Sequence, residues 1–184
     1  RRQLRDALSF IARSKLDADN IPTPQLVSAL VAAGMVPEAR AFLPTTPDTS
    51  TRPPDVASRR YLEGMVAAGE GRWTDAVTAL RASVAIPSSC PICGLAELAA
   101  AEEGAGQVQA AIATAERYVT TPFIHRFEPD AVHLGETLLR LTRLKAQVGD
   151  TAGANAARTR LRALWDGGDP TIVARLLSSP ATAR

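Results

Sequence analysis

Apolar residues recur at intervals of three and four positions along most of this chain, which is the spacing of one face of an α-helix. At the start, Leu4, Leu8 and Ile11 follow this spacing and predict an amphipathic helix over residues 2–16. The same periodicity predicts further helices at 24–33, 36–43, 55–68, 73–85, 91–103, 107–120, 130–147, 150–165 and 170–178. Because nothing in the chain reads as a strand, the predicted fold class is all-α.

A short motif, in which a glycine is followed two positions later by a larger residue and five positions later by an alanine, occurs four times. The copies are Gly34-x-Val36-x-x-Ala39, Gly71-x-Trp73-x-x-Ala76, Gly106-x-Val108-x-x-Ala111 and Gly149-x-Thr151-x-x-Ala154. A glycine just past a helix ends it by adopting a left-handed conformation at no steric cost. The alanine is expected where the two flanking helices come closest. Each copy therefore predicts a pair of packed helices.

The stretch over residues 61–83 resembles the tetratricopeptide repeat (TPR) family. The small residue, turn glycine, aromatic wedge and alanine of that family fall in register at Gly64, Gly71, Trp73 and Ala76. The resemblance is looser in the flanking copies and extends over roughly residues 23–166. It implies a right-handed α-solenoid of about four TPR-like helix hairpins with terminal capping helices.

On this interpretation the chain is a single array. The expected parts are a capping helix at 1–22, repeats at 23–47, 54–88, 90–122 and 131–166, an inserted loop at 123–130, and a C-terminal helix at 169–179. The Pro- and Thr-rich stretch at 44–54 is expected to be an exposed linker.

The segment from Cys90 to Pro170 is also similar to C-terminal helical-repeat regions of multidomain bacterial proteins. Such regions are often attached to a serine/threonine kinase or a transcriptional regulator. The chain itself has no Gly-rich phosphate loop, no His-Arg-Asp and no Asp-Phe-Gly. No catalytic constellation is found either, so we expect no enzyme activity, cofactor or metal in this segment.

The charge and the distribution of apolar residues argue against two classes of partner, nucleic acids and membranes. The chain has 21 basic and 19 acidic side chains and a net charge of +2, which is too balanced for a dedicated nucleic-acid-binding protein. No apolar run approaches the 18 to 20 residues, roughly, that are needed to span a bilayer, so this segment is expected not to insert into a membrane. The compartment stays open, because two cysteines do not define it.

Cys90 and Cys93 allow three interpretations. Proline at position 91 would make Cys90 the N-cap of a helix, where a thiol pKa falls, and a Cys-x-x-Cys there is the geometry of thiol oxidoreductases. Zinc would need further ligands, for which His125 and His133 are the candidates. The favoured interpretation is structural: two small side chains that fit the packing, or a disulfide if the domain is extracytoplasmic.

The insertion at 123–130 carries two aromatic residues, an arginine and a histidine. It either forms a lip that faces a ligand, or Phe123 and Phe127 plug the gap between adjacent hairpins. We favour the plug. Trp73 and Trp165 fall at helical packing positions and are expected in the core.

The expected function is docking of a protein or peptide on the concave face of the array. Polar residues of the inner helices are the candidate contacts: Arg60, Glu63, Glu97, Glu102, Arg140, Arg143 and Gln147. One alternative is a regulatory or sensory tail of a kinase or transcription regulator. Another is a homo-oligomer formed through the end helices, since a missing first partner would leave Leu4, Leu8 and Ile11 uncovered.

Overall fold

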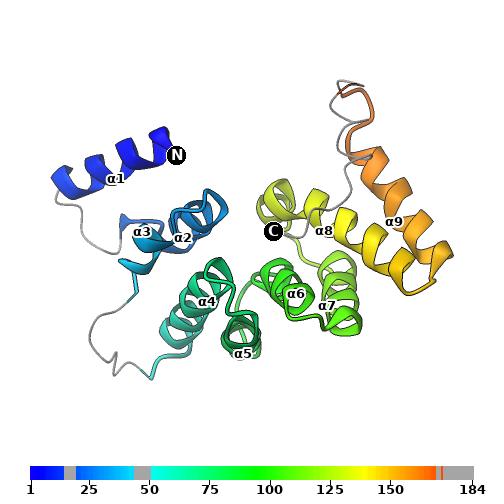
Figure 1. The fold of residues 1–184 in the computed structure, drawn as a ribbon, viewed down its shortest axis with the longest axis horizontal. Coiled ribbons are helices and arrows are strands. Elements are labelled where there is room, and N and C mark those ends of the chain that lie inside the picture. Colours follow the sequence, from blue (N-terminus) through cyan, green and yellow to red (C-terminus); the bar gives the residue numbers. More distant parts are fainter. Residues whose placement is uncertain (15–19, 44–50, 169–170, 172–184) are drawn as a thin grey trace. The chain divides into compact units, whose positions relative to one another are not determined.

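The computed structural model describes residues 1–14, 20–43, 51–168 and 171, and these residues are all-helical, as predicted. The described helices are α1 (Arg2–Ser14), α2 (Thr23–Ala32), α3 (Val36–Arg40), α4 (Pro53–Gly69), α5 (Trp73–Val84), α6 (Leu95–Gly104), α7 (Val108–Thr120), α8 (Phe127–Gln147) and α9 (Thr151–Leu164) (Figure 1). The predicted C-terminal helix at 169–179 lies outside the described residues, Thr171 excepted.

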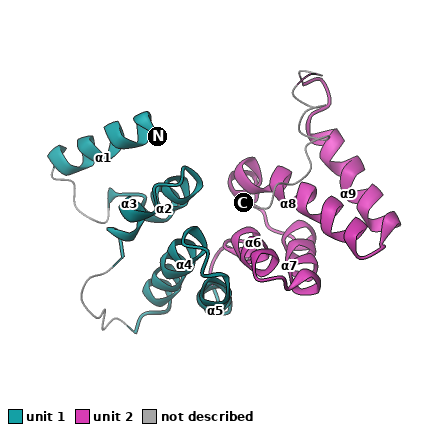
Figure 2. Cartoon of the chain, in the orientation of Figure 1, with its two compact units in different colours: residues 1–87 teal, residues 88–184 magenta. Residues whose placement is uncertain are grey.

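The chain divides into two compact units, Arg1–Pro87 and Ser88–Arg184, which we call unit 1 and unit 2 (Figure 2). Unit 1 contains α1 to α5, and unit 2 contains α6 to α9.

The core of unit 1 joins α2, α3 and α4. Its buried side chains are Val27, Leu30, Met35, Ala39, Leu62, Met65 and Val66. Helix α1 lays Leu4 and Leu8 against this cluster, and the Arg1 side chain donates from Nε to the carbonyl of Ala33 at 2.8 Å. The core of unit 1 therefore covers Leu4 and Leu8 in part, and Ile11 is half-buried as well. Association through the end helices stays a prediction.

The core of unit 2 runs through four helices that pack in chain order, α6 on α7, α7 on α8 and α8 on α9. A cluster of small and branched side chains fills it: Ala99, Ala111, Ile112, Ala115, Leu141, Leu144 and Ala157. The alanines let the helix backbones approach closely, because an alanine adds no side-chain bulk between them.

The four glycine motifs share one backbone geometry. The glycine φ angles are positive, at 68° (Gly34), 74° (Gly71), 72° (Gly106) and 82° (Gly149). In each motif the residue after the glycine donates its N–H to a carbonyl five positions earlier: Met35 to Leu30 at 2.8 Å, Arg72 to Ala67 at 2.9 Å, Gln107 to Glu102 at 2.8 Å and Asp150 to Lys145 at 2.8 Å. These bonds define a Schellman cap, so the glycines end their helices as the sequence pattern predicted.

The motif alanine is the fourth residue of the next helix and closes its first turn. Each one donates its N–H to the residue that directly follows the motif glycine: Ala39 to Met35, Ala76 to Arg72, Ala111 to Gln107 and Ala154 to Asp150. All four alanines are at most 3% exposed. The larger residue of the motif is less uniform, since Trp73 is half-buried and Thr151 is exposed.

Three predicted boundaries differ from the structure by three residues or more. The helix expected from residue 91 begins at Leu95, because Gly94 takes a left-handed φ of 79° directly before it. The helix expected from residue 130 begins at Phe127, so the second half of the predicted inserted loop is the first turn of α8. Acidic residues in that turn favour a helix start, because they face the positive end of the helix dipole. Helix α3 ends at Arg40 rather than at 43.

Candidate functional site

Unit 1 has a groove of about 480 Å³ on the α4–α5 pair. Helix α4 contributes Arg60, Glu63 and Ala67, whose spacing of three and four residues places them on one face. The other lining residues are Leu43, Arg72, Asp75, Thr78, Ala79 and Ala82. The groove therefore unites Arg60 and Glu63, two of the residues predicted to contact a partner.

Small side chains and ion pairs line this groove. Ala67, Ala79 and Ala82 leave the space, while Arg60 donates from Nη1 to Glu63 Oε2 at 2.9 Å. Arg72 pairs with Asp75 inside the groove and donates from Nη2 to Glu70 Oε2 at 2.7 Å. Two arginines and two carboxylates thus line the groove together with small residues.

Glu70, at the α4–α5 turn, forms ion pairs with Arg72 and Arg40. Burial raises the pKa of its carboxyl, but hydrogen bonds from Arg72 and Arg40 outweigh that effect and hold the pKa below its usual value. Glu70 is therefore ionised at neutral pH, and its carboxylate positions Arg72 at the edge of the groove.

The predicted contact residues of α6 lie in unit 2 and are not on an open surface. Glu102 is 2% exposed and accepts a hydrogen bond from Thr114 Oγ1 at 2.7 Å. The Glu97 side chain is 10% exposed and lies 3.4 Å from His133 Nε2. The expectation that Glu102 contacts a partner is wrong, because α7 covers that position and supplies its hydrogen-bond donor.

Glu103 was not singled out from the sequence, yet it organises α8. It accepts a hydrogen bond from Arg140 Nε at 2.8 Å and also pairs with Arg143. Arg140 and Arg143 are thus occupied within unit 2, whereas Gln147 is exposed at the last residue of α8. The signal available was the placement of Arg140 and Arg143 on one helix face, which calls for an acidic partner on the neighbouring helix.

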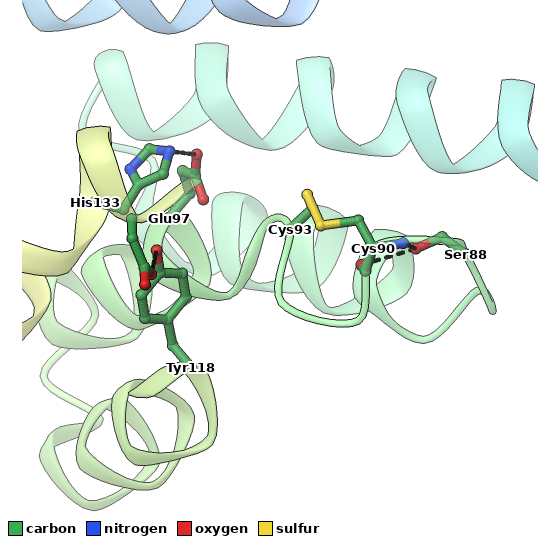
Figure 3. Close-up of a disulfide and its surroundings, with 7 residues drawn as sticks. Ser88, Cys90, Cys93, Glu97, Tyr118 and His133 are labelled. Atoms are coloured by element: carbon green, nitrogen blue, oxygen red, sulfur yellow. Dashed lines mark hydrogen bonds and ion pairs between the residues drawn. A yellow bond between two sulfur atoms is a disulfide. The ribbon is translucent and has the colours of Figure 1, made fainter. Parts of the chain in front are cut away.

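Cys90 and Cys93 form a disulfide in the turn before α6, with a Cα–Cα distance of 5.4 Å. Ser88 Oγ donates to the Cys90 carbonyl at 2.9 Å, and Ile92 between the cysteines is fully buried. Figure 3 places the disulfide on the turn, while His133 and Glu97 point toward one another beyond it. The described residues contain no group of three or more His, Cys, Asp and Glu side chains that could hold a metal ion. The two cysteines and two histidines considered for zinc are not brought together.

A second polar network holds the connection between α7 and α8. The Tyr118 hydroxyl donates to Asp130 Oδ1 at 2.9 Å, and Arg126 Nε donates to Asp130 Oδ2 at 2.6 Å. Arg126 Nη1 also donates to the carbonyl of Thr121 at 2.9 Å. Burial and then the bond to Asp130 raise the pKa of Tyr118, so the phenol stays protonated. Because Arg126 bonds both to Thr121 after α7 and to Asp130 in α8, it holds the connecting segment in place.

Phe127 does not plug a gap. It is 69% exposed, because the first turn of α8 directs it outward, whereas Phe123 stacks edge-on against His125 with ring centroids 5.8 Å apart. Trp165 lies over α8 near Gly135 and is half-buried.

Comparisons with protein-family models, curated proteins and solved structures find no match to this chain. Within the described residues, no helix combines the length and the apolar character that crossing a membrane would need.

Proposed function

We propose that this chain is a non-catalytic scaffold that binds a protein or peptide segment in the α4–α5 groove. The proposal includes a TPR-like, right-handed solenoid arrangement of the helix pairs. Its support is the repetition of the Schellman turn and of the buried alanine in four places, since equal turns followed by equal contacts favour a regular stack of helix pairs.

The groove is the part of the molecule in which the partner is proposed to bind. The groove is an open depression of about 480 Å³, so it offers a surface on which a segment of chain can lie. Its wall of alanines accepts side chains or the backbone of a partner, and the ion pairs Arg60–Glu63 and Arg72–Asp75 offer donors and acceptors at its rim. A peptide with alternating polar groups and small apolar groups fits this surface best.

The test is a selection of displayed peptides on the immobilised full chain, followed by titration of a selected peptide. Ala82→Phe fills the groove and is expected to weaken peptide binding at least tenfold. Ala85→Phe is the matched control, because Ala85 is the exposed C-cap of the same helix and lies outside the groove. Equal binding by both variants, or a selection that yields no binder, would contradict the proposal.

A second candidate function, a thiol-dependent sensor at Cys90 and Cys93, is favoured by the disulfide. The sequence predicts a helix from Pro91, whereas the disulfide-bonded chain begins α6 at Leu95. We expect reduction to let α6 extend backward toward Pro91, because Pro is tolerated in the first turn.

Circular dichroism of the full chain with and without reductant tests this second function. The expected result is a small gain of helical signal on reduction. The variant with Cys90→Ser and Cys93→Ser should show the higher signal in both conditions. An unchanged signal on reduction would count against the sensor.

A further inference from the structure

The two cysteines of the disulfide are unequally accessible to solvent. Cys93 is exposed, whereas Cys90 is half-buried. A small thiol opens a disulfide by attacking one of its two sulfur atoms, and the rate depends on access to the sulfur that is attacked. The fold therefore favours attack at Cys93 over attack at Cys90.

Hydrogen bonds hold the backbone of Cys90 in the turn before α6 (Figure 3). Ser88 Oγ accepts from the Cys90 N–H at 3.3 Å and donates to the Cys90 carbonyl at 2.9 Å. The same carbonyl accepts from the N–H of Cys93 at 3.3 Å. None of these bonds involves a sulfur atom, so opening the disulfide breaks none of them directly.

Ile92 ties the same turn to α6. Its side chain is fully buried, and its carbonyl accepts from the N–H of Leu95, the first residue of α6, at 3.2 Å. The Cα atoms of Cys90 and Cys93 lie 5.4 Å apart in the disulfide. Residues three positions apart are neighbours in a helix as well, so Cys90 stays close to Cys93 even where α6 extends backward. The thiol of Cys90 is therefore placed to react with any group bound to Cys93.

The structure removes the reason for expecting the more reactive thiol at Cys90. The sequence predicts Cys90 as a helix N-cap, where the helix dipole would favour its thiolate. In the structure the N-cap of α6 is Gly94, with a left-handed φ of 79°, and Cys90 lies outside the helix. Because the dipole effect is confined to the first turn, access to the sulfur is the property that separates the two cysteines.

We propose that Cys93 is the site at which a low-molecular-weight thiol opens the disulfide, and that Cys90 is the resolving cysteine. The thiolate of the small molecule attacks Cys93 Sγ, the bond between the two protein sulfur atoms breaks, and Cys90 leaves as a thiolate. Cys90 then either attacks Cys93 Sγ and expels the small thiol, or takes up a proton. In the second case another small thiol attacks the small-molecule sulfur of the mixed disulfide.

The products of that second route are two protein thiols and one small-molecule disulfide. The two protons come from the two small thiols, and the two electrons that reduce the protein disulfide are those that oxidise the small thiols. The proposal rests on the second candidate function and adds to it the attacked atom and the class of reactant.

Mapping of the mixed disulfide in the full chain tests the proposal. Glutathione is added at neutral pH, the reaction is stopped with acid, which protonates the thiolates, and mass spectrometric fragmentation locates the bound glutathione. We expect it on Cys93. The same reaction in guanidinium chloride is the matched control, because unfolding exposes both cysteines and should distribute glutathione over both. Glutathione on Cys90 in the folded chain, an equal distribution in both conditions, or no exchange in the folded chain would overturn the proposal.

Two variants measure the accessibility of each thiol separately. Cys90→Ser leaves the thiol of Cys93 and Cys93→Ser leaves that of Cys90, and neither variant can resolve a mixed disulfide. With glutathione disulfide as reagent, we expect the folded Cys90→Ser chain to react at least about threefold faster than the folded Cys93→Ser chain, and the two rates to converge in guanidinium chloride. Equal rates in the folded chains would also overturn the proposal.

Failure of this proposal and failure of the sensor are distinguishable. An unchanged helical signal on reduction would count against the sensor and leave the exchange site at Cys93 in place. Glutathione found on Cys90 would remove the proposed exchange site and leave the sensor to be judged by its helical signal.

Discussion

The α4–α5 pair and the α8–α9 pair share a turn and differ in what lies between their helices. Gly71 and Gly149 take φ angles of 74° and 82° and close the same pattern of hydrogen bonds. Seven positions before each glycine, however, α4 has Gly64 and α8 has Thr142. A Cβ on Gly64 would lie 2.5 Å from Leu80 Cγ, so α4 and α5 approach closely there.

Thr142 occupies the corresponding position in α8 without such a close approach. It is 8% exposed, and its hydroxyl donates to the Leu138 carbonyl of its own helix at 2.9 Å. The nearest comparable glycine of α8 is Gly135, whose added Cβ would meet Trp165 at an ordinary 3.7 Å. The comparison teaches that the turn is a local property of the chain, whereas the distance between paired helices depends on the side chains they place between them.

The largest expected change in stability comes from adding one methyl group between the helices of the α4–α5 pair. Gly64→Ala forces a Cβ into Leu80, which is fully buried, and overpacking of this kind costs up to about 3 kcal/mol. Alanine regains about 1 kcal/mol as the better helix former, so we expect a net loss of about 2 kcal/mol in the free energy of unfolding.

Gly135→Ala is the matched control in the α8–α9 pair, and we expect it to raise the free energy of unfolding rather than lower it. It makes only an ordinary contact with Trp165, so the helix-forming gain of about 1 kcal/mol remains. Denaturant unfolding of both variants, followed by helical signal, measures the difference. Equal losses in the two variants would mean that the α4–α5 pair is no tighter than the α8–α9 pair.

The next largest effect is the loss of stability when the turn glycine is replaced, and it should be the same in both helix pairs. Gly71→Ala and Gly149→Ala keep a positive φ with nothing within 4 Å of the new Cβ, so their cost is backbone strain alone, about 1 kcal/mol each. Asparagine tolerates this conformation better, so Gly71→Asn and Gly149→Asn should lose less. A cost confined to one of the two turns would break the equivalence that the hydrogen bonds indicate.

The smallest effect is the pH dependence that Asp150 gives the α8–α9 turn, where the α4–α5 turn has Arg72 at the corresponding position. The backbone N–H of Gly153 and the ammonium of Lys145 lower the pKa of Asp150 below its ordinary value. A lowered folded-state pKa stabilises the fold above the ordinary value of about 3.9, and this contribution is lost as the pH falls through the folded pKa. Asp150→Ala should therefore lower stability at pH 7 and cost progressively less below about pH 4.

Asp150→Asn separates the two causes. Asparagine retains an oxygen that accepts from Gly153 N–H but loses the charge that pairs with Lys145. We expect its stability at pH 7 to fall between those of the original chain and Asp150→Ala. Denaturant unfolding at pH 7 and pH 3 checks the order, and a loss in Asp150→Ala that is equal at both values would remove the carboxylate from the explanation.

Of the candidate site, the sequence located the α4 half. Arg60 and Glu63 share a helix face by spacing alone, and the structure places both in the groove. The other lining residues come from α5, from its N-cap Arg72 and from Leu43, which no spacing rule connects to α4. The prediction for Glu102 was wrong. A glutamate is usually exposed, but here α7 covers the side chain and Thr114 donates a hydrogen bond to it.

The sequence by itself determined the all-α class, the helix ends at the four glycines and the burial of the four motif alanines. The helix ends depend on hydrogen bonds and dihedral angles that span five residues or fewer, so a short stretch of chain contains all their causes. The burial of the alanines follows from their regular spacing in paired helices, although the side chains that cover them come from other segments. Only the tertiary structure decided that Glu103 binds Arg140, 37 positions away, that Glu102 is buried, and that Phe127 faces outward. The surroundings of a side chain are set by distant segments, whose approach depends on the packing of whole helices.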